Sequence, residues 1–274
     1  MRTRNAVVLI SLMISLVTAL LFVVGFGPGA GKLIQAAGNA AQAPQLDQAD
    51  AQLQQLLKLA REQVSGKLDT VVKWQGAWNS DLQAEPAAER LARQLGLSAV
   101  GTENVQGHEV YTSDGLKGGV MGKLSLMEVN GALYVIYRLD AEASAADELE
   151  QQQHEAGRVL LSNGVAAAWN GSVQGLAPLP GEQAATATSS ADGSSKDASV
   201  MLSSMEKEAG ELQASPIDSF EDGTTVSRTY EVPSFGITTL INGRKAGLQM
   251  ASHTDTVTGL QQVSYGSPML TIEY

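Results

Sequence analysis

Few side chains in this sequence suit acid–base or metal chemistry, because the chain has three histidines and no cysteine. Two of the histidines precede a glutamate, in His108-Glu109 and His154-Glu155. The helix of a zinc protease needs a second histidine four residues after the first, and Arg158 occupies that position after His154. We therefore expect His108 and His154 to be solvated residues rather than metal ligands.

The third histidine, His253, lies near the end of an expected strand, and Asp255 follows two residues later. Because residues i and i+2 of a strand share a face, this pair would form half of a metal site at best. A zinc ion takes three or four protein ligands. The sequence accordingly predicts no metal ligand and no cofactor.

Ser204 and Lys207 match the S-x-x-K pattern of penicillin-interacting enzymes. In those enzymes the partner motifs follow the serine, whereas the similar tripeptides here precede it, at 113–115 and 117–119. The Gly-Ala-Gly-Lys stretch at 29–32 lacks the spacing and the Ser or Thr of a phosphate-binding loop. We expect no catalytic residue, no cofactor-binding residue and no enzymatic activity.

Acidic residues outnumber basic ones by 29 to 18, and all of the acidic ones lie after Lys32. Residues 33–274 carry a net charge of −14, because Arg2, Arg4 and Lys32 contribute +3 to the total of −11. Such a charge repels phosphate backbones and argues against nucleic acid as a partner. Two acidic groups on expected helices are interpreted as solvated faces: Glu148, Glu150 and Glu155, and Glu206, Glu208 and Glu211.

The three tryptophans, Trp74, Trp78 and Trp169, fall on expected strands at positions that would face helices. Burial in the core is the first interpretation. The alternative is a shared groove, in which exposed indole rings would stack on sugars or cap a peptide.

Residues 6–27 form an almost continuously apolar run that is long enough to cross a bilayer, which takes roughly 20 residues. Arg2 and Arg4 precede it, so the positive-inside rule places the N-terminus in the cytoplasm and the body outside. We expect a single-pass membrane protein with an extracytoplasmic body. Secretion is the alternative, if the run is a cleaved signal.

Hydrophobic periodicity and turn residues predict alternating helices and strands in the body. Asn130-Gly131 and Asn242-Gly243 are strong hairpin signals. The expected helices cover residues 46–64, 87–95, 144–161 and 200–212. The expected strands cover residues 68–78, 108–112, 121–129, 132–139, 166–173, 225–232, 236–241, 244–253, 260–265 and 269–274.

The order of these elements repeats: helix, tryptophan strand, helix, strand and hairpin occur at 46–139 and again at 144–253. The last two strands have no counterpart in the first half. We predict an α+β fold of duplicated lobes, with antiparallel sheets and packed helices. The expected segments are an anchor at 6–27, a linker at 28–45, a first lobe at 46–175, a flexible loop at 176–198 and a second lobe at 199–274.

The N-terminal apolar segment, the repeated body and the ending Tyr265-Gly-Ser-Pro-Met-Leu-Thr-Ile-Glu-Tyr274 are similar to the YwmB family of spore-forming Gram-positive bacteria. The resemblance covers the body from about Leu46 to Tyr274. It implies a fold like that of the TATA-box-binding protein, with two related lobes and exchanged helices, and it implies no particular activity.

The function expected from these observations is a non-enzymatic binding or assembly module at the cell envelope. Its partner would be an envelope protein or a cell-wall component, with the membrane contacted through residues 6–27. The alternative is an enzyme, or the inhibitor of one, that acts on peptidoglycan. DNA binding is disfavoured despite the implied fold, because fold does not carry function and the body is acidic.

Overall fold

The computed structural model describes residues 42–179, 195–255 and 260–270. The predicted anchor at 6–27 and most of the linker and loop lie outside these ranges. The first described helix, α3 (Gln42–Gln63), begins inside the predicted linker. None of the helices in the described ranges is long and apolar enough to cross a membrane.

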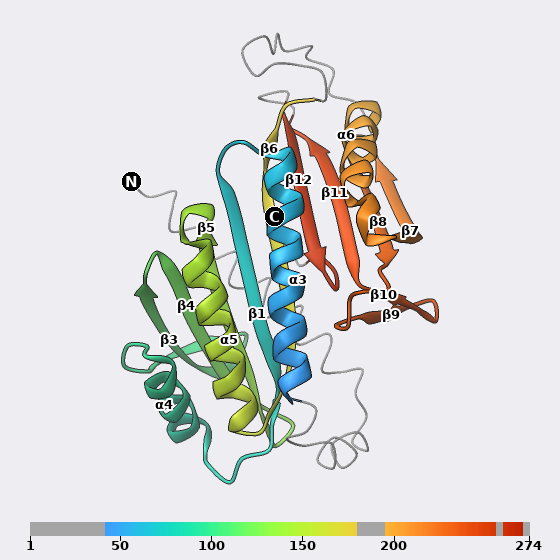
Figure 1. Ribbon diagram of the computed structural model, residues 1–274. Coiled ribbons are helices and arrows are strands. Elements are labelled where there is room, and N and C mark those ends of the chain that lie inside the picture. Colours follow the sequence, from blue (N-terminus) through green and yellow to red (C-terminus); the bar gives the residue numbers. More distant parts are fainter. Residues whose placement is uncertain (1–41, 180–194, 256–259, 271–274) are drawn as a thin grey trace.

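One antiparallel sheet of ten strands forms the body of the molecule (Figure 1). Its strand order is β2-β3-β4-β5-β1-β6-β12-β11-β8-β7. The strands of the first half are β1 (Leu68–Trp78), β2 (Gly101–Val105), β3 (His108–Lys117), β4 (Val120–Val129) and β5 (Ala132–Glu142). Those of the second half are β6 (Val165–Ala177), β7 (Ser215–Asp222), β8 (Thr225–Glu231), β11 (Leu248–Thr254) and β12 (Gln261–Ser267).

The two central strands, β1 and β6, pair along their whole length, with Trp74 directly opposite Trp169. Outward from β1 come β5, β4, β3 and β2, and outward from β6 come β12, β11, β8 and β7. β12 and β11 thus occupy the places beside β6 that β5 and β4 occupy beside β1, so the predicted strand at 260–265 does have a counterpart in the first half. The predicted lobe boundary at residues 175 and 176 falls inside β6.

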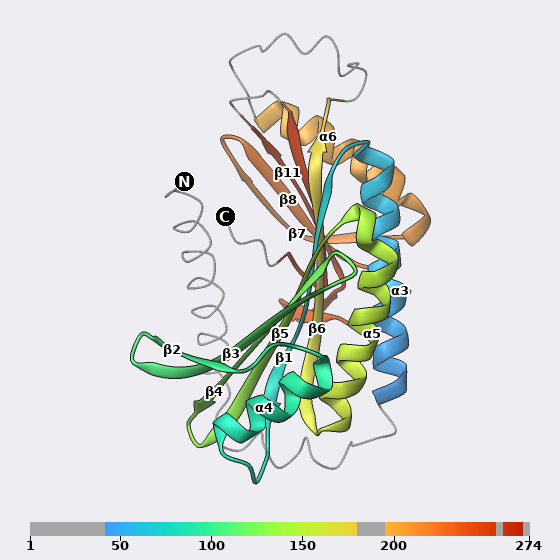
Figure 2. The same ribbon diagram turned by 90° about the vertical axis from the view of Figure 1, so that its left-hand side faces the viewer.

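Four helices cover one face of the sheet (Figure 2): α3, α4 (Ala84–Leu95), α5 (Ala146–Ser162) and α6 (Ser195–Glu208). α4 lies on β3 and β4, and α6 lies on β8 and β11. The two central helices lie over the middle of the sheet. α3, which precedes β1 in the chain, packs on β6 and β12, whereas α5, which precedes β6, also reaches β5 and β1.

The core lies between this helical layer and the sheet. Trp74 and Trp169 are its largest fully buried side chains, and leucines of α3 pack with them. The alternation of buried and exposed residues along β1 and β6 follows from this packing, because every second side chain points to the helices. The opposite side of the sheet is referred to below as the open face, since no helix of the described ranges covers it (Figure 2).

The two Asn-Gly turns have the expected left-handed backbone, with φ of 52° and 78° at Asn130 and Gly131 and 51° and 79° at Asn242 and Gly243. The first turn joins β4 to β5 as predicted. The expected strand at 244–253 is wrong as a single element. It breaks at Gly247, so that β9 (Thr239–Ile241) and β10 (Arg244–Ala246) form a separate small sheet and β11 joins the main one.

Two edge strands, β2 and β7, were not predicted. Their burial patterns are almost entirely exposed, so they lack the alternation that identifies a strand in a sequence. The predicted strand at 269–274 is wrong at its start, because β12 ends at Ser267, residues 268 and 269 are bends, and residue 270 is irregular. Its last four residues lie outside the described ranges.

Candidate functional site

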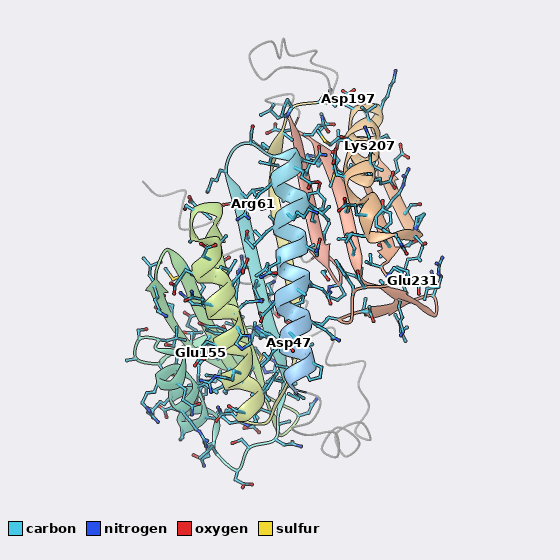
Figure 3. The ribbon with its side chains drawn as sticks, in the orientation of Figure 1. Asp47, Arg61, Glu155, Asp197, Lys207 and Glu231 are labelled. Carbon is cyan, nitrogen blue, oxygen red and sulfur yellow. The ribbon has the colours of Figure 1, made fainter. Side chains whose placement is uncertain are left out.

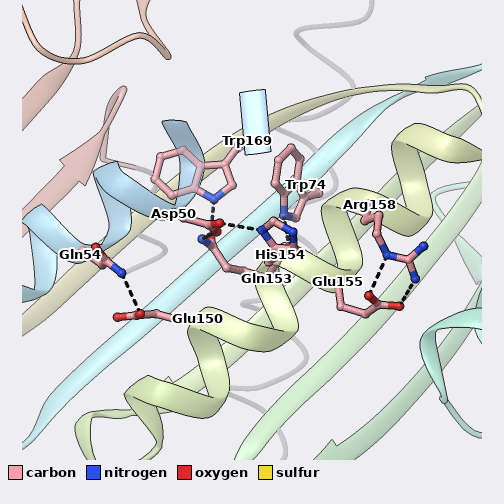
Figure 4. A network of polar contacts seen from close by, with 9 residues as sticks. All are labelled: Asp50, Gln54, Trp74, Glu150, Gln153, His154, Glu155, Arg158 and Trp169. Carbon is pink, nitrogen blue, oxygen red and sulfur yellow. Dashed lines mark hydrogen bonds and ion pairs between the residues drawn. The ribbon is translucent and has the colours of Figure 1, made fainter. Parts of the chain in front are cut away.

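A buried polar network joins α3 and α5 to the centre of the sheet (Figure 4). Gln153 of α5, which is fully buried, accepts a hydrogen bond from the indole N–H of Trp169 at Oε1 (2.8 Å). Its side-chain amide donates to Asp50 Oδ1 of α3 (2.6 Å). The indole N–H of Trp74 donates to the Gln153 carbonyl oxygen (3.1 Å). One glutamine therefore connects both central strands to both central helices.

His154 lies beside this network, with Nδ1 2.6 Å from Oδ2 of Asp50. A carboxylate at Nδ1 is the arrangement that orients a catalytic histidine toward a nucleophile. The imidazole is 45% exposed, at the outer surface of the helical layer. The prediction that His154 is merely solvated is therefore incomplete, because Asp50 holds one of its ring nitrogens and only the other edge of the ring faces solvent.

The remaining residues singled out in the sequence stay apart from this network. His108 is exposed, as predicted, at the start of β3. His253 is half-buried and forms a hydrogen bond between Nδ1 and Oγ1 of Thr225 (2.9 Å). Ser204 and Lys207 lie on α6, where Lys207 projects from the helical layer (Figure 3).

No group of three or more potential ligands that could hold a metal ion occurs within the described ranges. The tryptophans are in the core, as first expected, with exposed fractions of 0% for Trp74, 3% for Trp78 and 2% for Trp169. The groove alternative is wrong. Trp78 does border a shallow depression, but the other side chains there are mainly polar and its own ring is covered.

Five of the six acidic residues assigned to solvated faces have polar partners: Glu150 accepts from Gln54, Glu155 from Arg158 and Glu211 from Lys58, and Glu206 and Glu148 bind residues of the strands (Figure 4). Both carboxylate oxygens of Glu206 accept from the Arg228 guanidinium (2.8 Å each), and Oε1 also accepts from the Tyr230 hydroxyl (2.6 Å). Burial, followed by this hydrogen bond, raises the pKa of Tyr230. Glu148 accepts from Gln152 and pairs with Lys117 (3.3 Å), which lowers the pKa of its carboxyl. Glu206 and Glu148 therefore tie helices to strands.

The open face carries side chains of a different kind. Gln75, Asn170, Gln174, Gln249 and Gln262 alternate with the buried positions of four central strands and so point to this face. Gln262 donates to Gln174 across the β12–β6 pair (3.3 Å). Amides both donate and accept hydrogen bonds, so this surface suits a partner with many polar groups.

A row of basic side chains crosses the first half of the same face. Lys123 of β4 is opposite Arg138 of β5, and Arg138 is opposite Lys73 of β1. Arg138 also binds Asp140, two residues along the same strand (2.6 Å). This row could not be recognised from the sequence, because its members lie 15 residues or more apart in the chain and are brought together only by the strand register.

No family model matches this chain, and no curated protein matches it. Among solved structures, a match is found with DynU16, described as a protein in the dynemicin biosynthetic locus, at 10% sequence identity and a TM-score of 0.20. This match covers 72% of the chain and 86% of DynU16. A similarity that low informs neither fold nor function, so the function has to be argued from the chain's own surfaces.

Proposed function

We propose that this protein is a non-enzymatic binding module whose open face takes a polar partner. The observation that carries the proposal is the segregation of the helices to one side of a ten-stranded sheet. The other side presents amide side chains on four neighbouring strands. Such a broad surface is suited to an extended polymer or a protein face rather than to a small molecule in a pocket.

The arrangement of strands supports an internal duplication. Each half places its first strand at the centre and its later strands outward in descending order, and Trp74 and Trp169 pair where the halves meet. The packing of α3, a helix of the first half, on β6 and β12 of the second half accords with a fold like that of the TATA-box-binding protein. This topology and the C-terminal sequence support membership of the YwmB family.

We place the module at the cell envelope, anchored by residues 6–27, with the body outside the cytoplasm. The apolar run and the two arginines before it support this location. The acidic body disfavours nucleic acid as the partner. An envelope protein or peptidoglycan, both rich in polar groups, would fit the amides of the open face.

Photo-cross-linking from single positions tests which face is used. A benzophenone side chain replaces Ala168, exposed on the open face, or Gln151, exposed on the helical face. We expect the first position to couple to one envelope partner or to peptidoglycan, and the second to couple to neither. Equal coupling from both faces would contradict the proposal.

The second candidate, a peptidoglycan enzyme, draws on the Asp50–His154 pair, which resembles half of a catalytic triad. A zymogram separates the two candidates. Lytic clearing by the intact protein that disappears on His154→Ala or Ser204→Ala would favour the enzyme. Affinity of the protein for duplex DNA at ~150 mM salt would instead favour a nucleic-acid partner.

A further inference from the structure

A cavity of about 290 Å³ lies where β7 begins and β8 ends, next to the segment that forms the separate β9–β10 sheet. Glu231, the last residue of β8, marks its place in Figure 3. Its apolar lining includes Val232 and Phe235, which are 3% and 6% exposed. Its polar lining residues are Ser215, Glu231, Thr238 and Lys245. Cavities for drug-sized ligands measure about 300–1,000 Å³, so this one suits a small molecule.

The segment around this cavity is held in place by the body of the protein. The side chain of Gln52 on α3 donates to the Ile237 carbonyl oxygen (3.1 Å) and accepts from the Ile237 N–H (2.7 Å). The N–H of Phe235 donates to the Val232 carbonyl oxygen (3.1 Å). At Gly247 an added Cβ atom would lie 3.2 Å from Cβ of Phe235, so the two ends of the segment pack directly together. The cavity is therefore preformed, and a ligand need not order it first.

Two opposite charges of the lining have bonding capacity left for a ligand. Oε2 of Glu231 accepts from Arg244 (3.0 Å), whose guanidinium also donates to the Pro216 carbonyl oxygen (3.4 Å). Oε1 of Glu231 receives no donor from the described residues, and Lys245 has no hydrogen-bond or ion-pair partner among them. The cavity thus combines a free carboxylate oxygen and the three donors of an ammonium group with an apolar surface.

We propose that this cavity binds a free α-amino acid with a small aliphatic side chain. The ligand carboxylate binds Lys245, its ammonium group binds Oε1 of Glu231, and its side chain lies against Val232 and Phe235. A simple anion would meet the Glu231 carboxylate, and a simple cation would meet the Lys245 ammonium group. A zwitterion forms a charge-assisted hydrogen bond with each of them, and because it has no net charge, the acidic body does not repel it.

Equilibrium dialysis of the full-length protein against radiolabelled L-leucine tests the site. We expect saturable binding at millimolar leucine or below, weakened about tenfold or more by Lys245→Met, which removes the partner of the ligand carboxylate. Lys207→Met removes the same charge from an exposed position on α6 and should leave leucine binding unchanged (Figure 3). The absence of saturable binding at millimolar leucine, or equal binding by Lys245→Met and the parent protein, would overturn the proposal.

Competition by leucine analogues gives a second measurement on the parent protein, which stays decisive even if a substitution impairs folding. Leucinamide lacks the carboxylate that Lys245 would bind, and isocaproate lacks the amine that Glu231 would bind. We expect each analogue to displace leucine about tenfold or more weakly than leucine itself. Displacement by either analogue at the strength of leucine would overturn the zwitterion assignment. The proposal does not depend on the partner of the open face, so its failure would leave the cross-linking result from Ala168 unaffected.

Discussion

Replacing Gln153 by methionine removes the two side-chain hydrogen bonds of this residue, to Trp169 of β6 and to Asp50 of α3, while keeping the length of the side chain. The Trp169 indole N–H, which is 2% exposed, loses its acceptor, and an unsatisfied buried donor costs about 1–3 kcal/mol. Asp50 loses a donor worth about 1.5 kcal/mol, at the low end for a charged acceptor because Asp50 is 29% exposed and keeps His154. The thioether returns about 1 kcal/mol through apolar burial.

The expected net loss is about 1.5–3.5 kcal/mol, which lowers the melting temperature of a chain this size by about 3–14 °C. Thermal melts followed by circular dichroism and tryptophan fluorescence at pH 7 measure the change. Gln151→Met, on the exposed side of the same helix, is the matched control. If Gln153→Met melts within about 2 °C of the parent protein, the network does not contribute to stability as reasoned here.

Three further outcomes are expected. Gly157→Ala should lower the free energy of unfolding, measured by urea denaturation, by about 1–2 kcal/mol. The new methyl group would stand 2.6 Å from the Trp74 ring, and this overpacking outweighs the gain in helix propensity. Alkaline titration should unfold the protein steeply. Burial raises the pKa of Tyr137 to about 12, whereas this pKa is about 10 in the unfolded chain, which therefore loses the proton first. Stability that is present below about pH 10 is lost as the pH rises toward about 12, and phenolate absorbance should rise together with unfolding. Glu206→Gln should destabilise by about 1–3 kcal/mol, because Arg228 and the buried Tyr230 hydroxyl lose a charged acceptor. Glu208→Gln, at an exposed position of the same helix, should change the denaturation midpoint little.

Much of the fold was predictable because many of its elements carry local signals. The strand at 68–78 was predicted at its observed bounds, since Leu68, Val72, Trp74 and Trp78 all point to the helices. The Asn130-Gly131 turn is another local signal, because both residues need positive φ. The same signal at Asn242-Gly243 marked the turn but not the break at Gly247, where the chain leaves one sheet for another.

The candidate surfaces were less predictable, because they depend on register rather than on local pattern. In the sequence, Glu206 and Glu148 cannot be told apart from other helical glutamates. Their partners, Arg228 and Lys117, lie on strands that only the folded chain brings next to them. Gln153 is polar and stands in a helix, and only the pairing of the two tryptophan strands explains its burial. Long-range pairings of this kind cannot be predicted from a single sequence.

The packing of α3 on β6 and β12 has a consequence for the order in which the chain folds. Gln52 of α3 donates to Oγ of Ser267 at the end of β12, 215 residues further along (2.6 Å). Synthesis proceeds from the N-terminus, so the first helix of the body is made long before the strands that cover its apolar side. Until β12 is complete, α3 can pack only on β6, α5 and α6, so part of its apolar side stays uncovered. We expect folding to be slow and concerted, and to be completed only when β12 joins the sheet.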